Sequence, residues 1–233
     1  MLPPVCILAG GLGTRLGDVG RSTPKALLEV AGEPFLVHQI RLLAKHGAER
    51  IVLCVGHLGE QVEARIGPSQ DGVTIVYSYD SDELDGTLGA IRRARAHLGK
   101  RFLVTYCDTY LEIDYADFAR SWQKSNKSAG MCVLFNANKW DLSNVNFQNG
   151  EIVAYDKFAP TDEMLWIDYG LSAFESHALD LVGPEITDLA ILFHELSLNG
   201  ELFGYEATER FHEIGTPESL QETSRYLRER LGR

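Results

Sequence analysis

The sequence predicts an α/β fold with a Rossmann-like, mixed but mostly parallel sheet flanked by helices. In the first half of the chain, short β-rich runs alternate with amphipathic helical segments. The second half contains a hairpin signal and a further apolar strand, which predict a β extension of the same domain. A chain of 233 residues can bury one sizeable core, so we expect a single domain over residues 1–233.

The elements of the first half follow from their periodicity. A helix is expected over residues 34–46, where apolar residues recur at helical spacing and Gly47 provides a C-cap. A second helix is expected over residues 87–98, with its basic side chains largely on one stripe. The predicted strands of the sheet are residues 5–9, 51–55, 74–78, 102–106 and 131–135.

The second half predicts a hairpin that turns at Asn149-Gly150, followed by an apolar strand over residues 165–174. A polar helix is expected at residues 217–231. Ligands of such sheets bind at the carboxyl ends of the strands. We therefore expect a ligand site at that edge.

Charge and cysteine content narrow the class of protein. There are 22 Lys and Arg against 33 Asp and Glu, a formal net charge of −11, so broad nucleic-acid binding is not expected. The four cysteines form no C-x-x-C pair, which is typical of reduced, mostly buried thiols. No segment approaches the roughly 20 apolar residues of a membrane span, and no basic leader is present. We expect a cytoplasmic protein.

The glycine-rich segment 6–25, CILAGGLGTRLGDVGRSTPK, carries the main functional signal. A dinucleotide fingerprint would need glycine at position 16, where the chain has Leu16, and a P-loop would need Gly before and Ser or Thr after Lys25. Instead, glycines allow backbone N–H groups to approach an anion, while Arg15 and Lys25 stand ten residues apart. This combination suits a triphosphate. The glycines alone are equally typical of a surface turn.

The whole segment LAGGLGTRL, followed by PKALLEVAGEPFL, resembles the signature of the sugar nucleotidyltransferase (NDP-sugar pyrophosphorylase) family. Further segments resemble family elements in the same order along the chain. They are DGTLGAI (85–91), FLVTYCDTYL (102–111), YDKF (155–158), EITD (185–188) and FHEIGTPESL (211–220).

The resemblance implies that a sugar 1-phosphate attacks the α-phosphorus of a nucleoside triphosphate, giving an NDP-sugar and pyrophosphate. Arg15 and Lys25 would then be catalytic, because this chemistry depends on alignment and charge neutralisation. Residues implied to bind the nucleotide are Leu8, Ala9, Gly10, Gly11, Gly13, Thr14, Gly86 and Thr87. Those implied to bind the sugar phosphate are Asp156, Lys157, Tyr169 and Gly170. The nucleotide half would be about residues 1–110, and the sugar-phosphate half about 111–233.

Asp108 follows the predicted strand 102–106, and its carboxylate is a suitable ligand for Mg²⁺. The resemblance implies that Glu213 is the second metal-side acid, although the family usually has Asp there. Cys107 stands where the family has glycine. Glu213 would change the geometry of the metal site, and Cys107 would crowd the approach of the substrate.

Other functions stay open on sequence grounds. A related cytidylyltransferase acting on phosphocholine or a phosphonate would share the triphosphate motif, but a choline site would need an aromatic cage. A non-catalytic nucleotide-sugar sensor would not need Arg15, Lys25, Asp108 and Glu213 together. Segment 34–67 is most similar to the branch that includes heptose-1-phosphate guanylyltransferases, which implies GTP and a heptose 1-phosphate. The base, the sugar and a homo-oligomeric state stay open.

Overall fold

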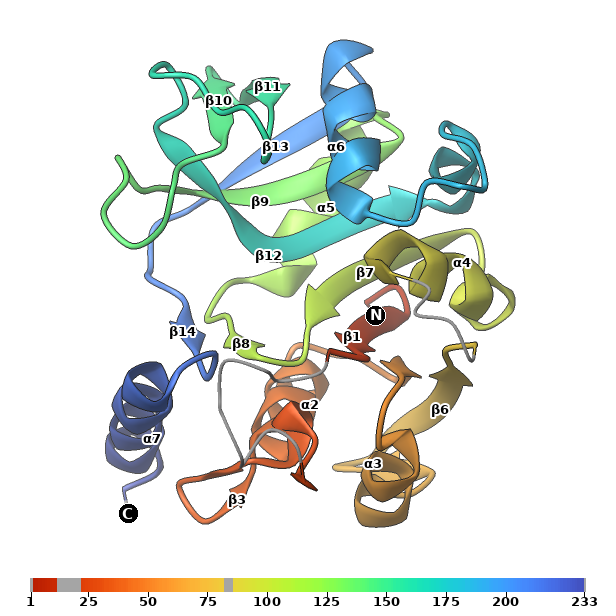
Figure 1. Ribbon diagram of the computed structural model, residues 1–233, viewed down its shortest axis with the longest axis vertical. Coiled ribbons are helices and arrows are strands. Elements are labelled where there is room, and N and C mark those ends of the chain that lie inside the picture. The colour runs from red at the N-terminus through yellow and green to blue at the C-terminus, as the bar shows by residue number, and fades with distance from the viewer. Residues whose placement is uncertain (1, 12–21, 82–85, 233) are drawn as a thin grey trace.

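The computed structural model describes residues 2–11, 22–81 and 86–232. Within them, one sheet of ten strands crosses the molecule (Figure 1). Its strands are β1 (Val5–Ala9), β4 (Arg50–Val55), β5 (Ser69–Gln70), β6 (Val73–Tyr79), β7 (Arg101–Tyr106), β9 (Ala129–Phe135), β10 (Val145–Gln148), β11 (Glu151–Tyr155), β12 (Trp166–Glu175) and β13 (Leu202–Ala207). Their spatial order is β10-β11-β13-β9-β12-β7-β1-β4-β6-β5.

Helices cover both faces of this sheet. The α-helices in the described residues are α2 (Phe35–Lys45), α3 (Gly59–Ile66), α4 (Gly86–Leu98), α5 (Tyr115–Ser125), α6 (Leu189–Leu198) and α7 (Pro217–Leu231). The short elements are η2 (Lys25–Leu27), η3 (Ser176–Asp180), the pair β2 (Glu29–Val30) and β3 (Glu33–Pro34), and the pair β8 (Thr109–Tyr110) and β14 (His212–Glu213). No helix among the described residues is long and apolar enough to cross a membrane.

The core lies in two layers because strand side chains alternate between the faces of the sheet. In β1, Val5, Ile7 and Ala9 belong to one apolar cluster, to which α2, α3 and α5 contribute. Cys6 and Leu8 belong to the other, under α4 and α6. A fully buried β1 explains why its sequence is a continuous apolar run.

The sheet is mixed, as predicted. Strands β7, β1, β4 and β6 are parallel neighbours, which is the Rossmann-like half. Strand β12 lies antiparallel between β7 and β9 and connects that half to the β extension. The predicted hairpin is β10–β11, and Asn149 (φ +52°) and Gly150 (φ +83°) both have the left-handed backbone that its two-residue turn requires.

Candidate functional site

A cavity of about 360 Å³ opens at the carboxyl ends of the parallel strands. From β1 the chain proceeds to β4 on one side and later returns to β7 on the other, so strand order reverses beside β1. Such a reversal leaves a crevice at the strand ends, where ligands of open α/β sheets bind. We call it the switch-point cavity.

Most of the predicted nucleotide-binding residues meet in this cavity. Ala9 does not, because it points to the opposite face and is buried in the core. Gly13, Thr14 and Arg15 lie outside the described residues, so their roles stay predictions. The predicted residues that line the switch-point cavity are Leu8, Gly10, Gly11, Lys25, Gly86, Thr87 and Asp108.

Asp80 also lines the cavity, and the sequence analysis missed it. A Cβ at Gly10 would lie 2.6 Å from Asp80 Oδ2, and one at Gly56 would lie 2.7 Å from it. A side chain at either position would therefore displace the Asp80 carboxylate from its place against the backbone. Asp80 directly follows β6, the same signal that singled out Asp108 after β7.

Lys25 and Asp108 form an ion pair, with 3.0 Å between Lys25 Nζ and Asp108 Oδ2. Their side chains are 12% and 28% exposed, so both remain accessible from the cavity. Thr109 Oγ1 donates to Asp108 Oδ1 at 3.3 Å. The structure thus joins the predicted catalytic lysine to the predicted metal ligand.

The turn that carries Asp108 is held from beneath by Gln39. This buried side chain of α2 donates through Nε2 to the carbonyl oxygens of Tyr106 (2.8 Å) and Thr109 (2.5 Å). The two carbonyls flank Cys107 and Asp108. A single buried amide therefore fixes both ends of the turn. No sequence motif marks Gln39, because its role depends on how α2 packs against the sheet.

Glu213 lies on β14, opposite Thr109 of β8. Ile214 N donates to Asp108 O at 3.0 Å, which holds the two segments together. The carboxylates of Asp108 and Glu213 are hard oxygen ligands and fit Mg²⁺ by their chemistry. In the described part of the chain no cluster of three or more metal-ligating side chains occurs. Phosphate oxygens and water would complete the coordination of such an ion.

A second cavity, of about 280 Å³, lies beside the first under β12, and we call it the β12 cavity. Thr87 and Tyr106 line both cavities. Of the predicted acceptor-binding residues, Lys157, Tyr169 and Gly170 line the β12 cavity. Gly170 has φ +85°, a left-handed conformation that favours glycine.

Asp156 does not line the β12 cavity, although its neighbours Tyr155 and Lys157 do. Its Oδ1 accepts hydrogen bonds from Phe158 N and Ala159 N, both at 2.8 Å. These backbone hydrogen bonds lower the pKa of the Asp156 carboxyl. In this structure Asp156 shapes a turn, and its predicted contact with the acceptor gains no geometric support.

Asp168 lines the β12 cavity instead, and the sequence analysis missed it. Burial raises the pKa of this carboxyl to about 6, while a hydrogen bond from Gly170 N and the charge of Lys157 oppose the shift. Carboxylates of Asp141 and Asp188 line the same cavity. A strand-embedded aspartate gives no sign of this role until the direction of its side chain is known.

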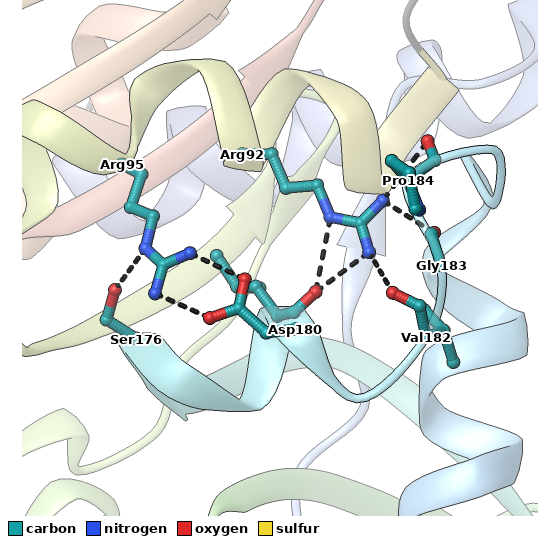
Figure 2. Close-up of polar contacts among 8 residues, drawn as sticks. Arg92, Arg95, Ser176, Asp180, Val182, Gly183 and Pro184 are labelled. Carbon is teal, nitrogen blue, oxygen red and sulfur yellow. Dashed lines mark hydrogen bonds and ion pairs between the residues drawn. The ribbon is translucent and has the colours of Figure 1, made fainter.

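Segment 176–188 packs against the start of α4, where Thr87 lines both cavities. Thr187 O accepts from Leu88 N (2.8 Å), and Thr87 Oγ1 accepts from Leu189 N (2.9 Å). Arg92 of α4 reaches the same segment, and Figure 2 shows its guanidinium surrounded by carbonyl oxygens. It donates to the carbonyl oxygens of Leu179, Val182, Gly183 and Ile186 at 2.8 to 3.2 Å, and to that of Pro184 at 3.5 Å.

The model of the MobA-like NTP transferase domain matches residues 5–179, which include the switch-point cavity and β12. The chain belongs to this family. Members of the family share the domain, and the residues matched here carry the glycine-rich segment, Asp108 and Lys157. The sequence resemblance to nucleotidyltransferases is therefore confirmed.

Curated relatives include a mannose-1-phosphate guanyltransferase beta-B of Xenopus laevis, 26% identical over 223 residues, covering 92% of this chain and 61% of the relative. A mannose-1-phosphate guanyltransferase of Gibberella zeae is 29% identical over 234 residues, covering 95% and 63%. The chain thus spans about three fifths of the length of these relatives.

Two solved structures share the fold. One is a Bacillus anthracis protein assigned as a glucose-1-phosphate thymidylyltransferase, in complex with a sucrose; its TM-score is 0.85 at 21% identity, covering 98% of this chain and 96% of that chain. The other is HddC from Yersinia pseudotuberculosis complexed with GMP-PN; its TM-score is 0.78 at 22% identity, covering 97% and 100%. At these identities the likeness concerns the fold alone.

Proposed function

We propose that the protein is a sugar-1-phosphate nucleotidyltransferase that joins a nucleoside triphosphate and a sugar 1-phosphate, releasing pyrophosphate. The observation that carries this proposal is the pair of adjoining cavities with Thr87 and Tyr106 in their common wall. Two substrates bound side by side would bring their reacting phosphates together at that wall. Proximity of this kind accounts for a large part of the rate in such reactions.

The nucleotide would bind in the switch-point cavity and the acceptor in the β12 cavity. Lys25 would neutralise phosphate charge on the nucleotide side, and Lys157 would hold the acceptor phosphate. An acceptor phosphate oxygen attacks the α-phosphorus, the bond from that phosphorus to the bridging oxygen breaks, and pyrophosphate leaves. Asp108 and Glu213 would hold Mg²⁺, which, when bound, neutralises phosphate charge during the transfer.

GTP is the nucleotide that we propose, with mannose 1-phosphate or a heptose 1-phosphate as the acceptor. The relatives named for mannose-1-phosphate guanylyl transfer support this choice, and so does the sequence resemblance to the heptose branch. The comparison structure that holds GMP-PN has the same fold. Discrimination between bases depends on a few edge contacts.

Three buried rings in the wall of the β12 cavity disfavour phosphocholine as the acceptor. A quaternary ammonium group binds to open faces of aromatic rings. Here Tyr155, Tyr169 and Phe193 are only 2%, 1% and 2% exposed. Tyr155 packs edge to face against Phe193, with 5.6 Å between the ring centroids. These three rings offer no open face to a cation, and Tyr106 and Phe211 are the half-buried aromatic residues of the lining.

The test is a turnover panel in which GTP, CTP, UTP and dTTP are each combined with several sugar 1-phosphates and with phosphocholine. Pyrophosphate release is the readout. We expect the highest kcat/KM with GTP and a manno-configured sugar 1-phosphate. Nucleotide binding without pyrophosphate release from any sugar phosphate would overturn the proposal and favour a sensor.

Lys157→Ala tests the division into two sites. It should raise the KM for the sugar phosphate far more than the KM for the nucleotide, because only one substrate loses its cation. The control is Lys124→Ala, which removes an exposed lysine on α5. Equal effects of Lys157→Ala on both KM values would contradict the division.

A further inference from the structure

Two residues with hydroxyl groups, Thr87 and Tyr106, stand in the common wall of the two cavities. The hydroxyl of Thr87 accepts a hydrogen bond from Leu189 N at 2.9 Å. The hydroxyl of Tyr106 makes no hydrogen bond within the described part of the chain, and it is not one of the buried unpaired polar atoms found there. It is therefore a donor without a partner that a ligand in the cavities can reach.

Tyr106 is the last residue of β7, and its backbone is fixed at the end of that strand. Gln39 Nε2 donates to the Tyr106 carbonyl oxygen at 2.8 Å, and the next amide, Cys107 N, donates to Leu8 O of β1 at 3.0 Å. The ring lies beside Gly170, in the bulge of β12 where the pairing with β9 shifts register; a Cβ at Gly170 would lie 3.7 Å from Tyr106 Cδ2. The sheet thus places the hydroxyl before any ligand binds.

The charges around the common wall show why a donor is useful there. In the lining formed by the described residues, the cations are Lys25 in the switch-point cavity and Lys157 in the β12 cavity. Lys25 is paired with Asp108, and the carboxylates of Asp168 and Asp188 line the β12 cavity. A phosphoryl group transferred at this wall is negatively charged, so a donor held in place stabilises it. A phenol stays protonated near neutral pH and donates without adding a charge.

We propose that Tyr106 is a further catalytic residue, whose Oη–H donates a hydrogen bond to a non-bridging oxygen of the nucleotide α-phosphate during the transfer. This inference rests on the proposed function and adds a residue to its chemistry. The α-phosphorus is bonded to the leaving pyrophosphate before the transfer and to the acceptor oxygen after it, so it must lie where the two cavities meet. Tyr106 stands at that place, and its proton stays on the phenol throughout.

Tyr106→Phe tests the proposal, because it removes only the hydroxyl and keeps the ring. The rate of a single turnover with both substrates saturating should fall about 10- to 150-fold, as expected for the loss of a hydrogen bond to a charged group. The Kd of each substrate should stay nearly unchanged, because the contact acts on the transferring group. The control is Tyr205→Phe, which removes a hydroxyl that donates to Asp117 Oδ2 at 3.0 Å, outside both cavities, and should retain the wild-type rate.

The two diastereomers of an α-thio nucleoside triphosphate identify the oxygen that accepts the bond. Sulfur is a weak hydrogen-bond acceptor. Wild type should therefore react more slowly with the diastereomer whose sulfur faces Tyr106, and Tyr106→Phe should lose most of that preference. Any effect of the sulfur on a bound metal ion is present in both enzymes and cancels in the comparison.

A folded Tyr106→Phe enzyme that retained more than about half of the wild-type single-turnover rate would overturn the role of Tyr106, while the nucleotidyltransferase function stands. A loss confined to the Kd of either substrate, or an unaltered preference between the α-thio diastereomers, would overturn it as well. Absence of turnover by wild type with all sugar phosphates would instead refute the proposed function itself.

Discussion

Replacing Arg92 by methionine tests whether one guanidinium holds segment 176–188 in place. In the structure this group donates to five carbonyl oxygens, four of them within 3.2 Å. Methionine preserves most of the aliphatic stem but removes every donor. The carbonyl oxygens then lose their partners together, and only those that water can reach regain one.

The magnitude follows from those contacts. A hydrogen bond with a charged partner contributes about 1.5 to 3 kcal/mol net. The segment lies at the surface, so water offsets part of the loss, and we expect Arg92→Met to lower the free energy of unfolding by about 3 kcal/mol. For a protein of this size, that corresponds to a fall in Tm of roughly 6 to 12 °C.

Arg95→Met is the matched control, one turn along the same helix (Figure 2). Arg95 binds Asp180 at 2.7 Å, but its side chain is 40% exposed and that of Asp180 is 61% exposed. Exposed ion pairs contribute about 0 to 1 kcal/mol. Thermal unfolding followed by circular dichroism measures both variants. Equal losses of Tm in the two variants would refute the assignment of the stabilisation to the carbonyl contacts of Arg92.

Three further predictions concern the site. Excess EDTA should abolish turnover, and Asp108→Asn should lose most of the rate while keeping the Tm; full turnover in EDTA would refute the metal requirement. Arg15→Ala, outside the described residues, should lose about 10² to 10³ in kcat at saturating nucleotide; retention of more than about a third would make Arg15 a bystander. Burial raises the pKa of Asp168 to about 6, above the roughly 3.9 of an unfolded aspartate. Ionisation of this carboxyl therefore lowers the free energy of unfolding. This loss is absent below about pH 4 and complete above about pH 6. Asp168→Asn should therefore raise the unfolding free energy by roughly 3 kcal/mol near pH 8 and leave it unchanged near pH 4; an equal gain at both values would contradict the pKa.

Elements with strong local signals were predicted well from the sequence. The helix Pro217–Leu231 was predicted with its observed bounds, because Thr216 caps it, Pro217 opens it and Gly232 closes it in a left-handed conformation. Helix α6 was not predicted. Its sequence LAILFHELSL is apolar on nearly every side, since the helix is buried against the sheet. Such a helix lacks the amphipathic period on which the prediction depends.

The site residues likewise differ in whether the local sequence predicts them. The glycine-rich segment and Asp108 stand at strand ends, where local sequence predicts a ligand edge. Gln39 and Asp168 make contacts that form only when distant segments pack together. Asp80 stands at a strand end like Asp108, and the sequence analysis overlooked it. The choice of Asp156 beside Lys157 overlooked the turn after β11, where Asp156 Oδ1 accepts from Phe158 N and Ala159 N. Lys157 and Tyr155 line the β12 cavity, and Asp156 between them does not.

The direction of β12 explains why the β12 cavity adjoins the switch-point cavity. Because β12 runs antiparallel to β7, its early residues lie at the edge where the parallel strands end, with Leu171 opposite Thr105. Thr105 Oγ1 donates to Gly170 O at 3.0 Å, which fixes the bulge at the end of β7. A parallel β12 would place Asp168 and Gly170 at the far edge of the sheet. One reversed strand therefore brings Asp168 beside the turn that carries Asp108, and no motif within either strand encodes that proximity.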